Sequence, residues 1–415
     1  MFKPRPYQVE ISDKAASILK ALKIVLLNIE VRCGKTFISL MTAQKLGSTK
    51  VLFVTKKKAI HSIQADYDTL SPAYAITIIN FESLHKVSDT YDLIIIDESH
   101  SISAYPKPSK RTKALKNLVG DTPLILMSGT ITPESWSQIY HQFWISNNSP
   151  FNESNFYGWA HTYVDVKKRY VAHGNQVNDY SRADYSLIRP IIDPYMITFT
   201  QREAGFTSTI NEQIHQVKMK PTTYKLVETL ESDLVYVGKH STILADTPTK
   251  LLSKIHQIYS GTVICEEGRS AVIDNSKGIY IKEEFKGIKI AIFYKFQKEL
   301  ELLQDIFKDQ LTTDLQEFNS THKNIALQIA SGREGISLKA AEALVMYNID
   351  HAAVSYWQAR DRMSTQDRLT NNVHWIFSKN GIEHNIYETV LKKRNFTTKH
   401  YEQTRKNGAV LRLAI

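Results

Sequence analysis

The sequence predicts an α/β protein with two parallel-sheet regions in tandem and a helical, aromatic-rich stretch between them. Its 415 residues exceed what one compact core usually holds. Short, wholly apolar runs alternate with amphipathic helical patterns in the first third of the chain, and the same alternation returns in the last third. Because such runs lack a polar face, they indicate strands of parallel sheets that helices cover on both faces.

The expected elements fall into two groups. In the first, residues 24–29 form a strand, followed by a loop and by an amphipathic helix that begins at Thr36 and ends near Gly47. Further strands are expected at 51–54, 76–79, 93–96 and 124–127. In the second group, strands are expected at 288–294, 325–329, 343–347 and 373–377, and helices at 297–307 and 354–362.

The middle stretch, roughly residues 135–260, is rich in aromatic residues such as Trp136, Phe143 and Trp159, and its pattern is largely helical. We place the boundary between the two regions near 201–210. The first lobe is then expected to span 1–205, with the helical insertion from about 135, and the second lobe 206–415, with a basic C-terminal tail.

Composition narrows the class of protein. The apolar fraction of 42% and the charged fraction of 23% are typical of a globular protein. The N-terminus lacks an apolar signal segment and the apolar runs are strand-length, so we expect a cytoplasmic protein that does not enter a membrane. Only two cysteines occur, Cys33 and Cys265, which favours a reducing compartment without a structural metal.

The net charge of +10 favours a polyanionic partner, although a solvated basic surface is the alternative reading. The basic residues form separate clusters. These lie at 56–58, 107–113, 167–169 and 392–406, and the last one interleaves Phe396 and Tyr401 with its charges.

A phosphate-binding loop is expected between the first strand and the first helix. The segment Arg32-Cys33-Gly34-Lys35-Thr36 places a glycine, a lysine and a hydroxyl where loop and helix N–H groups point at a phosphate. Lys35 supplies a positive charge and Thr36 a ligand for Mg²⁺. The glycine expected five residues before Gly34 is Ile29, so the motif is degenerate.

A carboxylate pair follows the buried strand at 93–96. Asp97 would hold Mg²⁺ and Glu98 would position or activate the attacking water. A helix cap is the competing explanation. It accounts for one carboxylate but not for the combination with the upstream lysine loop.

With these residues in place, the chain resembles the superfamily-two helicases. Asp97-Glu98-Ser99-His100 is similar to their DEAH-type box, and further matches follow in family order along nearly the whole chain. They are Arg5-Pro6-Tyr7-Gln8 (Q element), Val51 to Thr55 with Lys56 (motif Ia), Ile79-Asn80-Phe81-Glu82-Ser83-Leu84 (motif Ib), Ser128-Gly129-Thr130 followed by Thr132-Pro133 (motif III), Ile292-Phe293-Tyr294 (motif IV), Ser331-Gly332-Arg333-Glu334-Gly335-Ile336-Ser337-Leu338 (motif V) and Gln358-Ala359-Arg360-Asp361-Arg362 (motif VI).

Within the superfamily, the aromatic stretch after motif III and the form of motif VI resemble the Swi/Snf-like branch, and the compact length resembles its short phage-encoded members. The resemblance implies two RecA-like lobes with ATP and Mg²⁺ between them. Arg5, Tyr7 and Gln8 would read the adenine. Gly335, Gln358 and Arg362 would reach the nucleotide from the second lobe, with Arg362 on the γ-phosphate.

The resemblance also implies how hydrolysis is transmitted. His100, Ser128, Gly129 and Thr130 would couple the nucleotide site to the rest of the lobe. Nucleic-acid contacts are expected from Thr55, Lys56, Phe81, Ser83, Ser331 and Gly332. The contacts would be to the backbone without sequence specificity, DNA is favoured over RNA, and a monomer is expected, in a bacterial host's cytoplasm if a phage encodes the chain.

Two departures from the family pattern leave alternatives open. Thr365 stands where a further arginine is usual, so Arg362 acts alone or Arg360 or Arg368 substitutes. Cys33 either fills a tight loop or, beside a lysine and a helix N-terminus, is an oxidisable thiol.

The preferred function is an ATP-driven DNA translocase or helicase. An RNA helicase and a non-catalytic nucleic-acid-binding module with a degenerate ATPase site are the alternatives. The presence of Lys35, Thr36, Asp97 and Glu98 together argues against the non-catalytic module.

Overall fold

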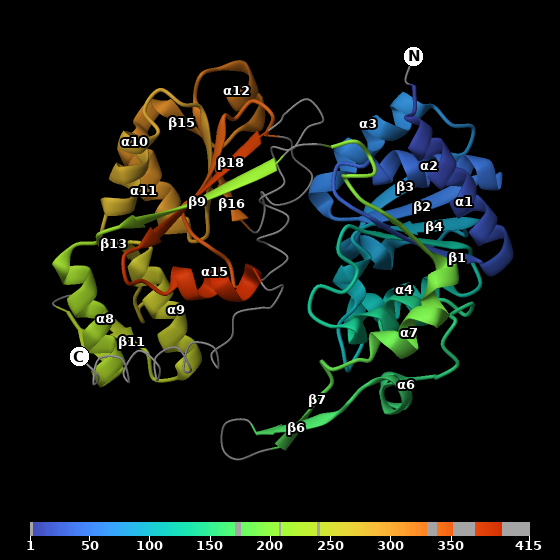
Figure 1. Cartoon of the computed structure of the whole chain (residues 1–415), viewed down its shortest axis with the longest axis horizontal. Coiled ribbons are helices and arrows are strands. Elements are labelled where there is room, and N and C mark those ends of the chain that lie inside the picture. The colour runs from blue at the N-terminus through green and yellow to red at the C-terminus, as the bar shows by residue number, and fades with distance from the viewer. Residues whose placement is uncertain are drawn as a thin grey trace. The chain divides into compact units, whose positions relative to one another are not determined.

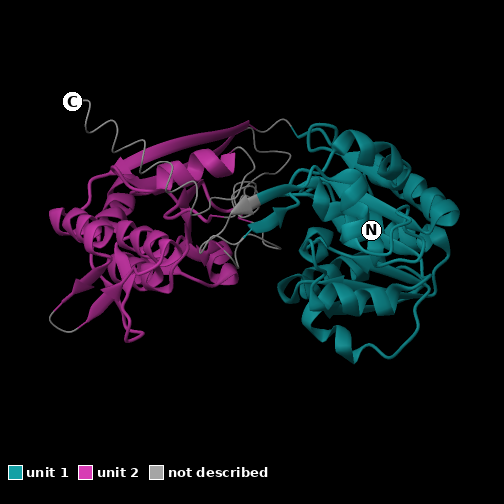
Figure 2. Ribbon diagram, turned by 90° about the horizontal axis from the view of Figure 1, so that it is seen from below, with its two compact units in different colours: residues 1–206 teal, residues 207–415 magenta. Residues whose placement is uncertain are grey.

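The chain divides into two compact units, residues 1–206 and 207–415, in the computed structural model (Figure 2). The structure describes residues 3–170, 176–206, 209–238, 241–329, 338–351 and 370–391. Each unit contains one six-stranded sheet in which every pairing is parallel. The two units are tandem RecA-like lobes, as the sequence predicts.

Unit 1 has the strand order β3-β2-β4-β5-β1-β8. Its strands are β1 (Ile24–Ile29), β2 (Lys50–Thr55), β3 (Ala75–Asn80), β4 (Leu93–Ile96), β5 (Leu124–Ser128) and β8 (Met196–Phe199). The predicted strands of this region are therefore confirmed, and β4 has the predicted bounds. Helix α2 (Lys35–Leu46) ends where Gly47 adopts a left-handed conformation at φ 79°, which also confirms the predicted stop.

Both faces of the first sheet are buried because successive strand residues alternate between them. Ile95 packs with residues of α1 (Pro6–Leu22), α2 and α3 (Ile60–Leu70) on one face. Ile94 and Ile96 pack on the other face with α4 (Lys110–Val119), α5 (Ile139–Trp144), α6 (Phe156–Tyr163) and α7 (Tyr185–Ile192). Figure 1 shows this sheet between its helices.

Unit 2 has the strand order β15-β16-β14-β17-β18-β9. Its sheet contains β9 (Thr209–Val217), β14 (Ile290–Tyr294), β15 (Leu311–Thr312), β16 (Asn324–Gln328), β17 (Ala343–Met346) and β18 (Thr370–Ser378). Helices α8 (Pro221–Asp233), α9 (Pro248–Tyr259), α12 (Leu315–Ser320) and α15 (Glu383–Leu391) pack on one face, and α10 (Ser276–Glu284) and α11 (Gln297–Phe307) on the other. The predicted strands and the helix at 297–307 are confirmed; the helix predicted at 354–362 lies outside the described residues.

The aromatic-rich middle stretch is shared between the units. Phe143, Phe156 and Trp159 belong to the core of unit 1, where they bury the side of the sheet that carries α5 to α7. The stretch also holds strands that the helical pattern did not predict. They are β8 and β9, the hairpin β6 (Lys167–Tyr170) with β7 (Gln176–Asp179), and the hairpin β10 (Val235–Val237) with β11 (Thr242–Leu244).

Candidate nucleotide site

Three loops meet at the carboxyl edge of the first sheet. Strands β4, β5 and β1 are neighbours in that order and run parallel, with Ile96 opposite Leu126 and Asn28 opposite Ser128. The loops that follow them therefore begin side by side. This edge gathers the lysine loop, the carboxylate pair and the Ser128-Gly129-Thr130 segment.

The lysine loop has a backbone that requires a glycine. Gly34 has φ 77°, and a β-carbon there would lie 2.1 Å from Nε2 of Gln8. Arg32 also has a positive φ, 65°. The chain turns at Arg32 and Gly34, whereas Ile29 stays in β1 and is fully buried. An isoleucine is therefore accommodated at the position where the motif usually has its first glycine.

Residues distant in the sequence brace this loop. The Gln201 side-chain amide donates to the Val31 carbonyl at 2.9 Å, and the Gln201 backbone N–H donates to the Glu30 carboxylate at 2.7 Å. The Glu30 N–H donates to the Phe199 carbonyl at the end of β8. The sequence carried no signal for Gln201, since some 170 residues separate it from the loop.

Lys35 begins helix α2. Its ammonium group donates to the Ile29 carbonyl at 3.0 Å, and a β-carbon on Gly129 would lie 3.4 Å from the same nitrogen. The small size of Gly129 thus leaves room beside the charge. The first turn of α2 presents N–H groups that have no acceptor inside the helix, which together with Lys35 is the chemistry that holds a phosphate.

Asp97 and Glu98 follow β4 on the same edge. The Thr55 hydroxyl donates to Asp97 Oδ2 at 2.8 Å, and the Glu98 N–H donates to Asp97 Oδ1 at 3.0 Å. Burial, with the neighbouring charge of Glu98, raises the pKa of Asp97 to about 6. Each carboxylate oxygen keeps a lone pair, so a divalent cation fits the charge and the donor set here.

Basic neighbours favour the ionised form of Glu98. Burial would raise its pKa, but the hydrogen bond and charge of His100, together with Lys35 and Lys56, lower the pKa to about 2. His100 Nδ1 lies 3.2 Å from Glu98 Oε2. Glu98 has φ 49°, a left-handed conformation that a non-glycine residue adopts at some cost, which is common at functional sites.

His100 joins the carboxylates to the loop after β5. Its Nδ1 lies 3.0 Å from the Ser128 hydroxyl, which donates to the Thr130 carbonyl and accepts from the Thr130 N–H. Because the single hydroxyl proton goes to that carbonyl, His100 Nδ1 carries the proton in the contact with Ser128. The predicted coupling residues are thus in direct contact.

The Q-element residues form the start of α1. The Gln8 side-chain oxygen accepts from the Arg5 N–H at 2.9 Å, and the Arg5 guanidinium donates to the Tyr7 hydroxyl at 3.0 Å. Tyr7 stacks on Phe199 with ring centroids 4.7 Å apart. Gln8 is buried against Gly34, so its position and the loop's shape depend on each other. Phe199, which no sequence motif indicated, is a further candidate residue of this site.

Of the two interpretations of Cys33, the structure supports the one in which the residue fills a tight loop. The thiol is fully buried among apolar residues of the unit 1 core. Burial raises its pKa to about 12, so it is protonated at neutral pH. The residue fills the loop, and the oxidisable-thiol alternative is contradicted.

The expected nucleic-acid residues do not share one environment. Thr55 and Phe81 are buried, and the Thr55 hydroxyl is directed to Asp97, so neither side chain reaches a surface. Lys56 and Ser83 are partly exposed, and the Ser83 N–H donates to Asn80. We therefore reassign Thr55 from nucleic-acid contact to the support of Asp97. Phe81 is reassigned to packing beneath Arg111, whose guanidinium lies 5.3 Å from the ring centroid.

The second-lobe motifs are only partly described. Ile292, Phe293 and Tyr294 of motif IV are buried in β14. The remaining predicted residues lie outside the described part of the chain, which leaves their geometry open. They are Ser331, Gly332, Gly335, Gln358, Arg360, Arg362, Thr365 and Arg368.

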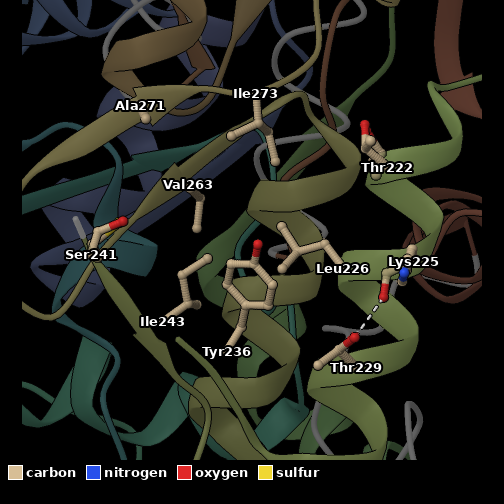
Figure 3. A pocket seen from close by; sticks show the side chains of 12 residues that line it. Thr222, Lys225, Leu226, Thr229, Tyr236, Ser241, Ile243, Val263, Ala271 and Ile273 are labelled. Carbon is tan, nitrogen blue, oxygen red and sulfur yellow. Dashed lines mark hydrogen bonds between the residues drawn. The ribbon is translucent and has the colours of Figure 1, made fainter. Parts of the chain in front are cut away.

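Unit 2 also contains an open pocket of about 500 Å³ between α8 and the hairpins β10–β11 and β12 (Thr262–Ile264)–β13 (Ser270–Val272). Figure 3 shows Leu226, Tyr236 and Ile243 pointing toward one another across it. Its lining holds hydroxyl groups and Lys225 but no carboxylate. It therefore lacks the donor set of a magnesium–nucleotide site.

The described residues contain no group of three or more histidine, cysteine, aspartate or glutamate side chains arranged to hold a metal ion. None of the helices in the described ranges has both the length and the apolar character needed to cross a membrane.

No protein-family model matches this sequence, and no curated protein matches it. Among solved structures, the chain is similar to the Sulfolobus solfataricus SWI2/SNF2 ATPase core in complex with double-stranded DNA. The identity is 16% over 94% of this chain and 91% of that one, with a TM-score of 0.43. It is similar to the same organism's SWI2/SNF2 ATPase core domain at 16% identity over 95% and 89% of the two chains, with a TM-score of 0.40.

Proposed function

We propose that this chain is a nucleic-acid-dependent ATPase that moves along DNA. The observation that carries the proposal is the meeting of Lys35, Asp97 and Glu98 at one edge of the first sheet, with His100 linking them to Ser128. This set suits phosphoryl transfer to water, because it combines a phosphate cradle, a metal ligand and an ionised carboxylate for the water.

Each candidate site residue of unit 1 has a distinct role in this proposal. The first turn of α2 and Lys35 would bind the β- and γ-phosphates, and Thr36 with Asp97 would hold Mg²⁺, which would neutralise phosphate charge. Thr55 fixes the orientation of the Asp97 carboxylate. Glu98 orients the attacking water, and its lowered pKa keeps it ionised at neutral pH.

A second-lobe arginine completes the proposal. Arg362 is the residue that the sequence motif selects, and an arginine on the γ-phosphate typically accelerates hydrolysis by ~10³–10⁵. Arg362→Ala should therefore abolish turnover while ATP binding persists. Arg368→Ala should do much less, and near-normal turnover in Arg362→Ala would refute this role.

Movement along DNA is inferred from coupling and charge. The His100–Ser128–Thr130 contacts give the nucleotide site a direct path to the loop after β5. The net charge of +10 favours contacts with the phosphate backbone.

Steady-state ATP hydrolysis with no nucleic acid, single-stranded DNA, duplex DNA and single-stranded RNA tests the proposal, with Lys35→Ala as the control for the site. We expect strong stimulation by duplex DNA that the variant loses. Stimulation by RNA alone would replace the DNA translocase with an RNA helicase. Absence of hydrolysis under all four conditions would leave a nucleic-acid-binding module.

A further inference from the structure

A two-stranded arm extends from unit 1. Within the described residues, strands β6 and β7 pair with each other and with no further strand, over four residue pairs from Lys167–Asp179 to Tyr170–Gln176. Figure 1 shows them leading away from the sheet and helices of the unit. A lone hairpin has marginal stability in water, so its orientation depends on how its base is fixed.

The base of the arm is fixed to the aromatic core. Asp165 N–H donates to the Arg182 carbonyl at 3.0 Å, and Asp184 N–H donates to the Tyr163 carbonyl at 2.8 Å. The Ser135 hydroxyl donates to the Ser181 carbonyl at 2.7 Å.

Aromatic contacts add to these hydrogen bonds. Trp136 stacks on Tyr185 with ring centroids 4.1 Å apart, and Tyr180 packs edge-on against Phe156 at 5.4 Å. Contacts of both kinds surround the base on several sides, so the arm leaves the lobe in a defined direction.

The arm is rich in basic residues. Its two carboxylates, Asp165 and Asp179, lie at the base, where Asp179 is in register with Lys167, and no aspartate or glutamate occurs between them in the sequence. Lys167, Lys168 and Arg169 occur in that interval. The Lys167–Asp165 ion pair spans 3.1 Å, but its side chains are 56% and 58% exposed, so water screens it and a phosphate can replace it at little cost.

The two lysines face opposite sides of the ribbon. Consecutive strand residues point to opposite faces, so Lys167 and Lys168, both exposed, place one ammonium group on each face. A ribbon that lay flat on its partner would need positive charge on one face only. Charge on both faces suits a partner that surrounds the ribbon with negative groups.

We propose that the β6–β7 arm is a basic ribbon that contacts both phosphate backbones of duplex DNA from within a groove. The major groove, about 12 Å wide, admits a two-stranded ribbon, and four residue pairs give this ribbon a length of roughly 13 Å inside it. Phosphates line both walls of the groove, so an ammonium group on each face of the ribbon would reach one wall each. This inference rests on the proposed function and adds a second DNA contact to it.

The test is the affinity of the full chain for a fluorescent duplex of about 30 base pairs, measured by anisotropy at 50 and 200 mM salt. The variant Lys167→Gln/Lys168→Gln removes both charges. The matched control is Lys14→Gln/Lys20→Gln, which changes two exposed lysines of α1. Lys167→Arg/Lys168→Arg retains the charge and should restore binding.

Each phosphate contact contributes about 0.9 to the slope of log affinity against log salt. Losing two contacts should lower that slope by about 1.8. The affinity deficit of the glutamine variant should therefore be roughly tenfold larger at 50 mM than at 200 mM salt. ATP hydrolysis without DNA should match that of the wild type, since the arm lies outside the nucleotide site.

A slope and affinity equal to those of the α1 control would overturn the proposal. An equal loss of affinity for single-stranded DNA of the same charge would overturn insertion into a groove. Failure of the proposed function is distinguishable, because the wild-type chain would then show no stimulation of hydrolysis by any nucleic acid.

Discussion

Replacing Thr55 with valine tests whether this buried hydroxyl serves the carboxylate or a nucleic acid. Thr55 is fully buried and donates to Asp97 Oδ2 at 2.8 Å. Valine keeps the shape and removes the donor. A hydrogen bond to a charged group contributes about 1.5–3 kcal/mol. If that interaction is needed in the transition state, kcat/KM for ATP should fall by roughly 10- to 150-fold.

The assay is steady-state ATP hydrolysis at saturating duplex DNA, followed by a titration of DNA at fixed ATP. We expect a lower rate at saturation and an unchanged DNA concentration for half-maximal stimulation. Thr42→Val is the matched control, because Thr42 is also fully buried in unit 1 but donates to the Ile38 carbonyl within α2. A normal rate at saturation with a raised half-maximal DNA concentration would refute our reassignment of Thr55.

Three further substitutions test the site and the cores. Gly34→Ala should abolish binding of a fluorescent ATP analogue, because its β-carbon would meet Gln8; Gly47→Ala, at a similar φ with no atom within 4 Å, should bind normally, and equal affinities would contradict the loop geometry. Lys277→Met should leave Glu383 buried without its partner and cost about 3–5 kcal/mol in thermal unfolding, since both side chains are fully buried. The double variant Lys277→Met/Glu383→Leu should regain most of that stability. If it does not, the loss in Lys277→Met comes from altered packing and not from the unpaired charge of Glu383. Burial lowers the pKa of His141 from 6.5 to about 4, so the unfolded chain binds this proton first as the pH falls. Unfolding free energy should therefore drop by about 2 kcal/mol between pH 7.5 and pH 5 through this residue. This contribution to the decrease in unfolding free energy should be absent in His141→Gln and present in His161→Gln, the control at an exposed histidine. A decrease in His141→Gln as large as in the wild type would refute the role of His141.

The buried strands could be predicted because their pattern is local. Residues 93–96 are all apolar and lie between polar neighbours, so the strand has the predicted bounds. Edge strands lack this signal. β9 lies at the edge of its sheet with most side chains partly or fully exposed, and its polar residues conceal the alternation. The β6–β7 hairpin is polar as well, and its position depends on distant aromatic contacts.

The candidate site likewise contains residues that the sequence predicts and residues that it does not. Lys35, Asp97 and Glu98 were predictable because each follows a strand or begins a helix in a short motif. Their supports were not, because Gln201 contacts Val31, and Gln8 contacts Gly34, through the folded chain. Thr55 was assigned to nucleic acid from its motif, whereas the strand pairing of β2 with β4 turns its hydroxyl toward Asp97.

Movement along duplex DNA is the central claim, and displacement of a triplex-forming strand measures it most directly. We expect the wild-type chain to displace the third strand with ATP but not with a non-hydrolysable analogue. Glu98→Gln should bind ATP and duplex yet displace nothing, because it cannot orient the attacking water. Displacement by Glu98→Gln at the wild-type rate, or none by a wild-type chain whose ATP hydrolysis duplex DNA stimulates, would contradict the account.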